Sequence, residues 1–257
     1  MSGGNGRLLV VGLGPGAPEW VTLEATQVLA EVSDLVGYAP YLARLPERPG
    51  QVRHASDNRE ELARARQALA LAASGRRVAI VSGGDPGVFA MAAAVFEALE
   101  TGEPSWRGLD VRIIPGITAM QAAAARLGAP LGHDFCAISL SDNLKSWSVI
   151  EKRLAAAADA DFVLALYNPA SRARPSRIHD AFGCLRARKA ATTPVIFARA
   201  IGRPDEEVTV TSLAEADPGL ADMATLIIIG SSATRVISNG SPSRPFVYTP
   251  RREGARR

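Results

Sequence analysis

The stretch RVAIVSGGDPGVFAMAAAVFEAL, residues 77–99, decides the expected fold. Residues 78–81 are a short apolar run, typical of a buried parallel strand. The run ends in Ser82-Gly83-Gly84, and we expect a helix to follow at once, with Asp85 as N-cap and Pro86 at its first position. Such a glycine turn suits an ordinary strand-to-helix connection, but it also lets a ligand approach the backbone amides. It is therefore a candidate site.

Two further strand-turn-helix units belong to the same half of the chain. A strand over 7–11 leads into GLGPG at 12–16, and a strand over 110–114 leads into PGITA at 115–119 and a helix over 119–127. The first turn imitates a dinucleotide-binding fingerprint, but Pro15 stiffens it where a phosphate-cradling helix should open. Thr118 caps its helix or faces a ligand at the carboxyl edge of the sheet.

The second half of the chain contains more predicted strands than helices. Strands are predicted over 135–140, 161–166, 194–198, 207–211 and 225–229, and helices over 147–158 and 176–188. We expect a mixed sheet here. The interpretation is an α/β protein with domains at 1–132 and 133–237 and a flexible basic tail at 238–257.

Composition excludes several classes of protein. The 257 residues are 47% hydrophobic, with a net charge of +3 and no apolar run or leader that would suit a membrane or secretion. We therefore expect a cytoplasmic protein with no membrane partner. Cys136, Cys184 and three scattered histidines lack ligand spacing, so no metal site is expected. The C-terminal arginines have no interleaved aromatic residues, which argues against a nucleic-acid partner.

Four motifs together resemble the tetrapyrrole methylase family. They are GLGPG at 12–16, SGGDPG at 82–87, PGITA at 115–119 and LYNP at 166–169, and the resemblance covers about residues 7–237. It implies two α/β domains of the tetrapyrrole methylase type with the active-site cleft between them. It also implies S-adenosylmethionine as cofactor, a small-molecule tetrapyrrole as substrate and a homodimer.

The resemblance also implies the site residues. It places the macrocycle against Gly14, Pro15 and Gly16. The cofactor-binding set that it implies consists of Pro15, Gly83, Gly84, Asp85, Val88, Thr118, Ala119, Tyr167, Asn168, Ala200 and Ile201. The Ala200-Ile201 segment and the Tyr167-Asn168 pair are matched by position.

Within the family, residues 139–174 and 56–65 resemble the branch that methylates precorrin-3B at carbon 17 and contracts the ring. The contraction needs a proton acceptor, for which Asp142, Tyr167 and Asn168 are the nearest candidates, although Asn168 can only hydrogen-bond and Asp142 suits a turn. Residues 143–146 depart from the pattern of the branch, which has a more apolar pair and a Thr-Pro there.

Other functions remain open at this point. Cobalt-factor III, the cobalt-containing analogue of the oxygen-independent route, would need the same cleft and the same methyl transfer to carbon 17. A non-catalytic tetrapyrrole carrier would lack cofactor binding. Pro15 disfavours an NAD-dependent dehydrogenase, and the absence of an aromatic and basic groove disfavours an RNA methylase.

Overall fold

The computed structural model describes residues 6–57, 60–170, 176–240 and 245–252. The chain forms two compact units, which divide between Thr118 and Ala119. The helices and strands of the first unit are β1 (Arg7–Gly12), η1 (Pro18–Trp20), α1 (Leu23–Glu31), β2 (Asp34–Tyr38), α2 (Ala39–Leu42), β3 (Val52–Ser56), α3 (Glu61–Ala73), β4 (Arg77–Ser82), α4 (Met91–Thr101), η2 (Pro104–Gly108) and β5 (Asp110–Ile114).

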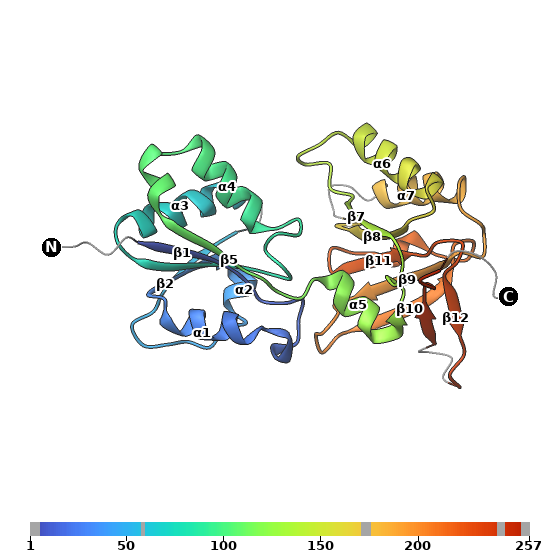
Figure 1. The fold of residues 1–257 in the computed structure, drawn as a ribbon, viewed down its shortest axis with the longest axis horizontal. Coiled ribbons are helices and arrows are strands. Elements are labelled where there is room, and N and C mark those ends of the chain that lie inside the picture. The colour runs from blue at the N-terminus through green and yellow to red at the C-terminus, as the bar shows by residue number, and fades with distance from the viewer. Residues whose placement is uncertain (1–5, 58–59, 171–175, 241–244, 253–257) are drawn as a thin grey trace. The chain divides into compact units, whose positions relative to one another are not determined.

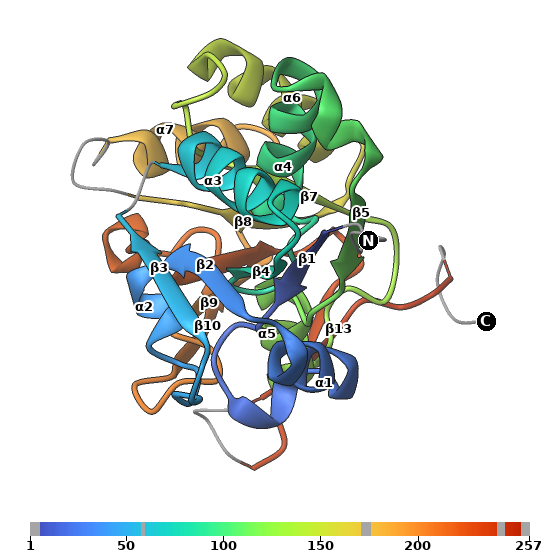
Figure 2. The ribbon, with the colours of Figure 1, turned by 90° about the vertical axis from the view of Figure 1, so that its left-hand side faces the viewer.

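A five-stranded parallel sheet forms the centre of the first unit, in the order β3-β2-β4-β1-β5 (Figure 2). Strand β4 is apolar on both faces because both are covered. Val78 and Ile80 pack with α3 and α4, whereas Ala79 and Val81 pack on the opposite face, which α1 and α2 cover (Figure 1). The neighbouring strands β4, β1 and β5 run in one direction, so the turns that follow them lie at the same edge.

The helix after β4 begins later than expected. Helix α4 starts at Met91 with Ala90 as N-cap, so the prediction that Asp85 caps it is wrong. A turn occupies the intervening residues, closed by a hydrogen bond from the Ala92 amide to the Pro86 carbonyl (2.9 Å), and Phe89 has a positive φ of 52°. Left-handed backbone interrupts a helix, which explains the delay.

A buried carboxylate lies at the start of β2. Asp34 is fully buried and accepts hydrogen bonds from His54 (2.8 Å), Arg76 (2.7 Å) and Ser33 (2.8 Å). Burial alone would raise the pKa of Asp34, but these three partners hold that pKa below its ordinary value of 3.8. The cluster joins β2 to β3 and to the segment before β4.

The second unit contains the remaining elements. They are α5 (Ala119–Leu127), β6 (Gly128–Ala129), β7 (Phe135–Ser139), α6 (Trp147–Asp159), β8 (Val163–Tyr167), α7 (Arg177–Arg186), β9 (Pro194–Arg199), β10 (Glu207–Ser212), η3 (Pro218–Leu220), β11 (Thr225–Ile229), β12 (Arg235–Ile237) and β13 (Phe246–Tyr248).

The main sheet of the second unit has the order β10-β9-β11-β8-β7. Only the β7–β8 pair is parallel among its described pairings, so the prediction of a mixed sheet is confirmed. One face packs on α6 and α7 through a core that includes Leu154, Leu166, Phe182 and Ile227. Figure 1 shows these two helices side by side over that face, with α5 on the other side of the sheet.

Residues 119–129 belong with the second unit. Helix α5 contacts β11 and β13, and the short strand β6 pairs with β13. The compact units therefore divide earlier in the chain than the domain boundary expected after Gly132.

The prediction of a flexible tail from residue 238 is wrong for residues 246–249. Strand β13 pairs with β12 on one side and with β6 on the other, and Val247 is fully buried. The Thr249 hydroxyl donates to the Pro130 carbonyl (2.6 Å). An apolar, β-branched segment such as Phe-Val-Tyr forms a strand where a partner exists. Residues 241–244 and 253–257 lie outside the described residues.

The structure also bears on membrane spans, cysteines and metal-binding clusters. No helix within the described part of the chain is long and apolar enough to cross a membrane. Cys136 and Cys184 are both free thiols and half-buried, and burial raises the pKa of each. The residues that the structure describes contain no group of three His, Cys, Asp or Glu side chains that could hold a metal ion.

Candidate functional site

Two of the predicted turns are joined by backbone hydrogen bonds. The Gly84 amide donates to the Gly14 carbonyl (2.9 Å), and the Gly14 amide donates to the Gly84 carbonyl (3.2 Å). The Leu13 amide also donates to the Ser82 carbonyl (2.9 Å), which continues the β1–β4 pairing past the strand ends. Turns 12–16 and 82–87 therefore form one backbone platform.

The third turn packs against this platform because its glycine has no side chain. A Cβ on Gly116 would overlap the Gly84 carbonyl oxygen and would lie 3.0 Å from the Gly12 Cα. A Cβ on Gly12 would meet the Gly84 oxygen at 2.7 Å. Gly84 itself, with a φ of 67°, has room for a Cβ, which would lie at van der Waals distance from the Ile117 oxygen (3.9 Å) and the Thr118 Cα (4.0 Å). Gly84 therefore lies directly beside the turn that carries Thr118.

Asp85 connects the second and third turns. Its Oδ1 accepts from the Gly87 amide (2.8 Å), and its Oδ2 accepts from the Gly116 amide (3.0 Å). Both carboxylate oxygens thus bind backbone amides, one of them in a distant segment. Asp85 fixes the position of the turn that carries Thr118.

The other predicted residues of the first unit surround the same turns. Gly14, Pro15 and Thr118 are buried, whereas Gly16 and Val88 are partly exposed. The Val88 amide donates to the Asp85 carbonyl (3.3 Å). The structure therefore brings the predicted residues of the first three motifs to one edge of the parallel sheet.

Sequence analysis missed two residues that support these turns. Tyr41 on α2 lies directly over Gly83, because a Cβ there would be 2.8 Å from the Tyr41 hydroxyl oxygen. Just after α2, Arg44 donates hydrogen bonds to carbonyls of the 12–16 turn. Residues 38–50 contain three prolines, but no motif marks Tyr41 or Arg44, and both became visible only in the structure.

The fourth motif lies at the end of β8 in the second unit. The Tyr167 hydroxyl accepts a hydrogen bond from the Met120 amide (3.2 Å) in the first turn of α5. Asn168 has a positive φ of 52°, and its Nδ2 donates to the Ser139 hydroxyl at the end of β7 (3.0 Å). The predicted pair Tyr167-Asn168 is therefore held beside the start of α5, which also carries Ala119.

Ala200 and Ile201 lie at the same edge of the mixed sheet. Strands β8 and β9 both run antiparallel to β11, so their carboxyl ends point the same way. Ala200 has a positive φ of 48°, and both residues are buried. Glu206 accepts from the Gly202 amide (2.7 Å) and forms a bidentate pair with Arg126 of α5 (2.8 and 3.0 Å). Helix α5 thus contacts Tyr167 directly and is linked to the Ala200-Ile201 segment through Glu206 and Gly202.

Asp142 has a charged neighbour. Its Oδ2 accepts from Arg177 Nε (3.2 Å), and the Arg177 guanidinium lies 4.9 Å from the centre of the Trp147 ring. One oxygen of this carboxylate is therefore engaged by the guanidinium. The catalytic role of Asp142 stays a prediction, as do those of Tyr167 and Asn168.

The chemistry of the first unit's site is that of a backbone platform. The amides of Gly14, Gly84, Gly87 and Gly116 are bonded within the turns, so the turns form a rigid backbone surface. A rigid surface of this kind can recognise a ligand by its shape. Such a site suits a reaction in which one substrate is already activated and the protein mainly aligns the partners.

Comparison with known proteins identifies the family. A family model described as Tetrapyrrole (Corrin/Porphyrin) Methylases matches residues 7–217, so the chain belongs to this family. The predicted family, the class of enzyme and the α/β fold of the two-domain methylase type are thereby confirmed. The active-site cleft expected between the two units stays a prediction.

Within this family, the chain is most informatively compared with three methyltransferases. The chain is 58% identical over 247 residues to the precorrin-3B C(17)-methyltransferase of Sinorhizobium sp, covering 96% of each chain. It matches the crystal structure of the methyltransferase CobJ with a TM-score of 0.91 at 52% identity, covering 95% of this chain and 100% of that chain. It also resembles the uroporphyrin-III C-methyl transferase from Thermus thermophilus complexed with S-adenyl homocysteine. That match has a TM-score of 0.67 at 26% identity and covers 88% of this chain and 97% of that chain.

Proposed function

We propose that this chain transfers a methyl group from S-adenosylmethionine to carbon 17 of precorrin-3B and contracts the ring. The observation that carries the proposal is the platform of three turns, joined by the Gly14–Gly84 bridge and by Asp85. The similarity to a precorrin-3B C(17)-methyltransferase over nearly the whole of both chains supports the choice of substrate.

The residues present fit S-adenosylmethionine. A side chain on Gly84 would fill the space beside the Ile117 oxygen (3.9 Å) and the Thr118 Cα (4.0 Å), where a ligand can instead lie against the backbone. When bound, the cofactor supplies an electrophilic methyl group on a sulfonium. We propose that Pro15, Gly83, Gly84, Asp85, Val88 and Thr118 hold it from the first unit and that Ala119, Tyr167, Asn168, Ala200 and Ile201 hold it from the second.

The contribution of the protein is alignment. We propose that the 12–16 turn orients the macrocycle so that carbon 17 lies in line with the methyl group. Holding the two reactants in line in this way can lower the activation barrier by on the order of 7–11 kcal/mol. Hydrogen bonds fix both side chains: the Met120 amide binds the Tyr167 hydroxyl, and the Ser139 hydroxyl binds the Asn168 side chain. We propose that this pair positions the ring during contraction.

We also propose that the protein acts as a homodimer in the cytoplasm, on the basis of the family resemblance. Sedimentation of the purified chain tests the first point: a single species at the monomer mass at working concentrations would contradict it.

The experiment that tests the function has two stages. Calorimetry first measures the affinity of the protein for S-adenosylmethionine. The protein is then incubated with radiolabelled cofactor and either precorrin-3B or cobalt-factor III. We expect micromolar cofactor binding and faster label transfer to precorrin-3B. Faster transfer to cobalt-factor III would assign the cobalt-containing substrate, and tetrapyrrole binding without cofactor binding would indicate a carrier.

A further inference from the structure

Arg44 contacts the 12–16 turn through its whole guanidinium group. Nη2 donates to the carbonyls of Leu13 (2.7 Å) and Gly16 (3.3 Å), and Nη1 donates to the carbonyl of Gly14 (3.1 Å). These three carbonyls span the turn from the end of β1 to the residue after Pro15. A single planar group therefore sets the direction of most peptide units in the turn.

This arrangement requires an arginine. The guanidinium presents several N–H donors in a rigid plane, whereas a lysine ammonium is a point charge on a flexible stem. Carbonyls held by a charged donor form stronger hydrogen bonds than neutral pairs do. A lysine at this position could keep the charge, but its single nitrogen could not occupy the two donor positions from which Nη1 and Nη2 reach these carbonyls.

The segment that carries Arg44 is itself anchored on the second turn. Helix α2 places the Tyr41 ring against Gly83, and Tyr38 packs edge-on against Tyr41 with ring centres 5.4 Å apart. Arg53 of β3 donates to the carbonyls of Leu42 and Leu45 (3.0 and 2.9 Å), on either side of Arg44, and so anchors the same segment to the sheet. Arg44 thus has a fixed base from which to hold the turn.

We propose that Arg44 is a positioning residue for methyl transfer: it holds the 12–16 turn in the geometry that orients the tetrapyrrole. The inference rests on the proposed function, since that turn is the proposed macrocycle contact. Arg44 acts through the backbone of the turn and not on the reacting atoms. Its loss should therefore lower kcat more than it weakens cofactor binding.

The test compares Arg44→Met and Arg44→Lys with the matched control Arg186→Met. Arg186, in the second unit, also donates to two backbone carbonyls, of Leu213 (3.1 Å) and Ala216 (2.6 Å), and lies over the Phe182 ring; none of these three is a predicted site residue. Measurements are kcat and KM for the tetrapyrrole, the Kd of S-adenosylmethionine, the melting temperature, and amide hydrogen exchange of the 12–20 peptide.

We expect Arg44→Met to lower kcat by about tenfold to a hundredfold, because a misplacement of about 1 Å has effects of this size. Its cofactor Kd should change by less than about threefold, and Arg44→Lys should recover only part of the rate. Exchange in the 12–20 peptide should accelerate only in the Arg44 variants. Arg186→Met should lose stability without losing kcat.

Two results would overturn the inference. Arg44→Met could retain the wild-type kcat, or it could lose kcat only in proportion to a stability loss that Arg186→Met reproduces. If the wild-type protein transfers no methyl group, the proposed function fails, and hydrogen exchange still decides the inference: unchanged exchange in the 12–20 peptide would refute the role of Arg44 in holding the turn.

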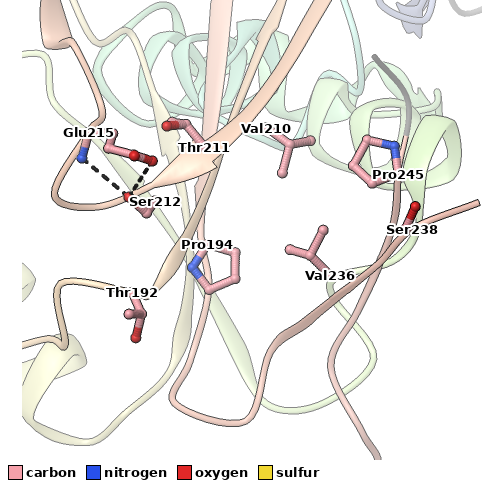
Figure 3. Close-up of a pocket in the computed structure, with 9 residues that line it drawn as sticks. All are labelled: Thr192, Pro194, Val210, Thr211, Ser212, Glu215, Val236, Ser238 and Pro245. Carbon is pink, nitrogen blue, oxygen red and sulfur yellow. Dashed lines mark hydrogen bonds between the residues drawn. The ribbon is translucent and has the colours of Figure 1, made fainter. Parts of the chain in front are cut away.

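A pocket in the second unit does not carry a further proposal. It has a volume of about 520 Å³ and lies between the β10 edge and β12 in the second unit, lined by residues that include Pro194, Val210 and Val236 (Figure 3). Its acidic residue, Glu215, accepts a hydrogen bond from the neighbouring Ser212 hydroxyl (2.9 Å) and is thereby engaged locally.

Discussion

The substitution Asp85→Asn separates two roles for this residue. As a helix N-cap, asparagine is as good as aspartate, so the change would be nearly neutral. As the bridge seen in the structure, asparagine fails. It has one oxygen in place of two, so either Gly87 or Gly116 would face an NH₂ group where it now meets an oxygen.

The magnitude follows from the lost contact. A hydrogen bond to a charged group contributes about 1.5–3 kcal/mol, and the partial exposure of Asp85 favours the lower end. We expect a loss of about 1.5–2 kcal/mol, which lowers the melting temperature of a chain of this size by roughly 3–8 °C. The turn bearing Thr118 should also shift, so the affinity for S-adenosylmethionine should fall by about tenfold, equivalent to 1.4 kcal/mol.

The assay is thermal unfolding followed by circular dichroism, with calorimetry of cofactor binding. Asp217→Asn is the matched control, because Asp217 Oδ1 accepts from the Gly219 amide at 2.8 Å and caps η3. That local bond has the same length as the Asp85–Gly87 bond, and asparagine can form it as well. If Asp85→Asn behaved like Asp217→Asn in both measurements, the bridging role would be refuted.

Five further changes test other parts of the structure. Gly116→Ala should cost about 3 kcal/mol, at the upper end for overpacking, because its Cβ would overlap the Gly84 carbonyl oxygen. Gly84→Ala should cost about 1–2 kcal/mol by backbone strain alone, and thermal unfolding of both variants measures the difference. Tyr167→Phe should slow methyl transfer several-fold in a steady-state assay, because the start of α5 loses its hydroxyl acceptor. Truncation after residue 240 should lower the melting temperature sharply, because it removes β13 and the buried Val247. Asp34→Asn should reduce the loss of unfolding free energy as the pH is lowered from about 7 to about 2. The folded-state pKa of Asp34 is depressed, so in the wild type its carboxylate stabilises the fold above the unfolded-state pKa. The wild type loses that contribution as the pH falls.

Each of these expectations has a contradicting result. Gly116→Ala that is better tolerated than Gly84→Ala would mean that the turns are not in close backbone contact. A wild-type rate in Tyr167→Phe would remove that hydroxyl from the site. An unchanged melting temperature after truncation would restore the flexible-tail interpretation, and an identical acid limb in Asp34→Asn would show that the carboxylate has the same pKa in both states.

The strands and most helices could be predicted because their signals are local. Residues 78–81 are apolar on both faces, and this alone indicates a central parallel strand. The start of α4 could not be predicted, because the position of Asp85 depends on Gly116, which lies far away in the sequence. Local capping preference and long-range bridging compete for the same carboxylate, and the second prevails.

Composition misled where a short strand has distant partners. Serine and proline before Phe246 suggested disorder, yet β13 is stabilised by pairing with β6 and β12. The support of the site by Tyr41 and Arg44 was invisible for the same reason. Neither belongs to a motif, and their importance appears only once the glycine turns are folded beside them.

The most direct measurement of the central claim is the carbon-13 NMR spectrum of the product formed from precorrin-3B and methyl-labelled S-adenosylmethionine. The account predicts one enriched methyl group attached to carbon 17 of a ring-contracted tetrapyrrole, with a mass that includes that methyl group. A label at carbon 17 of an uncontracted ring would contradict the contraction, and a label at any other carbon, or no label at all, would contradict the proposed function itself.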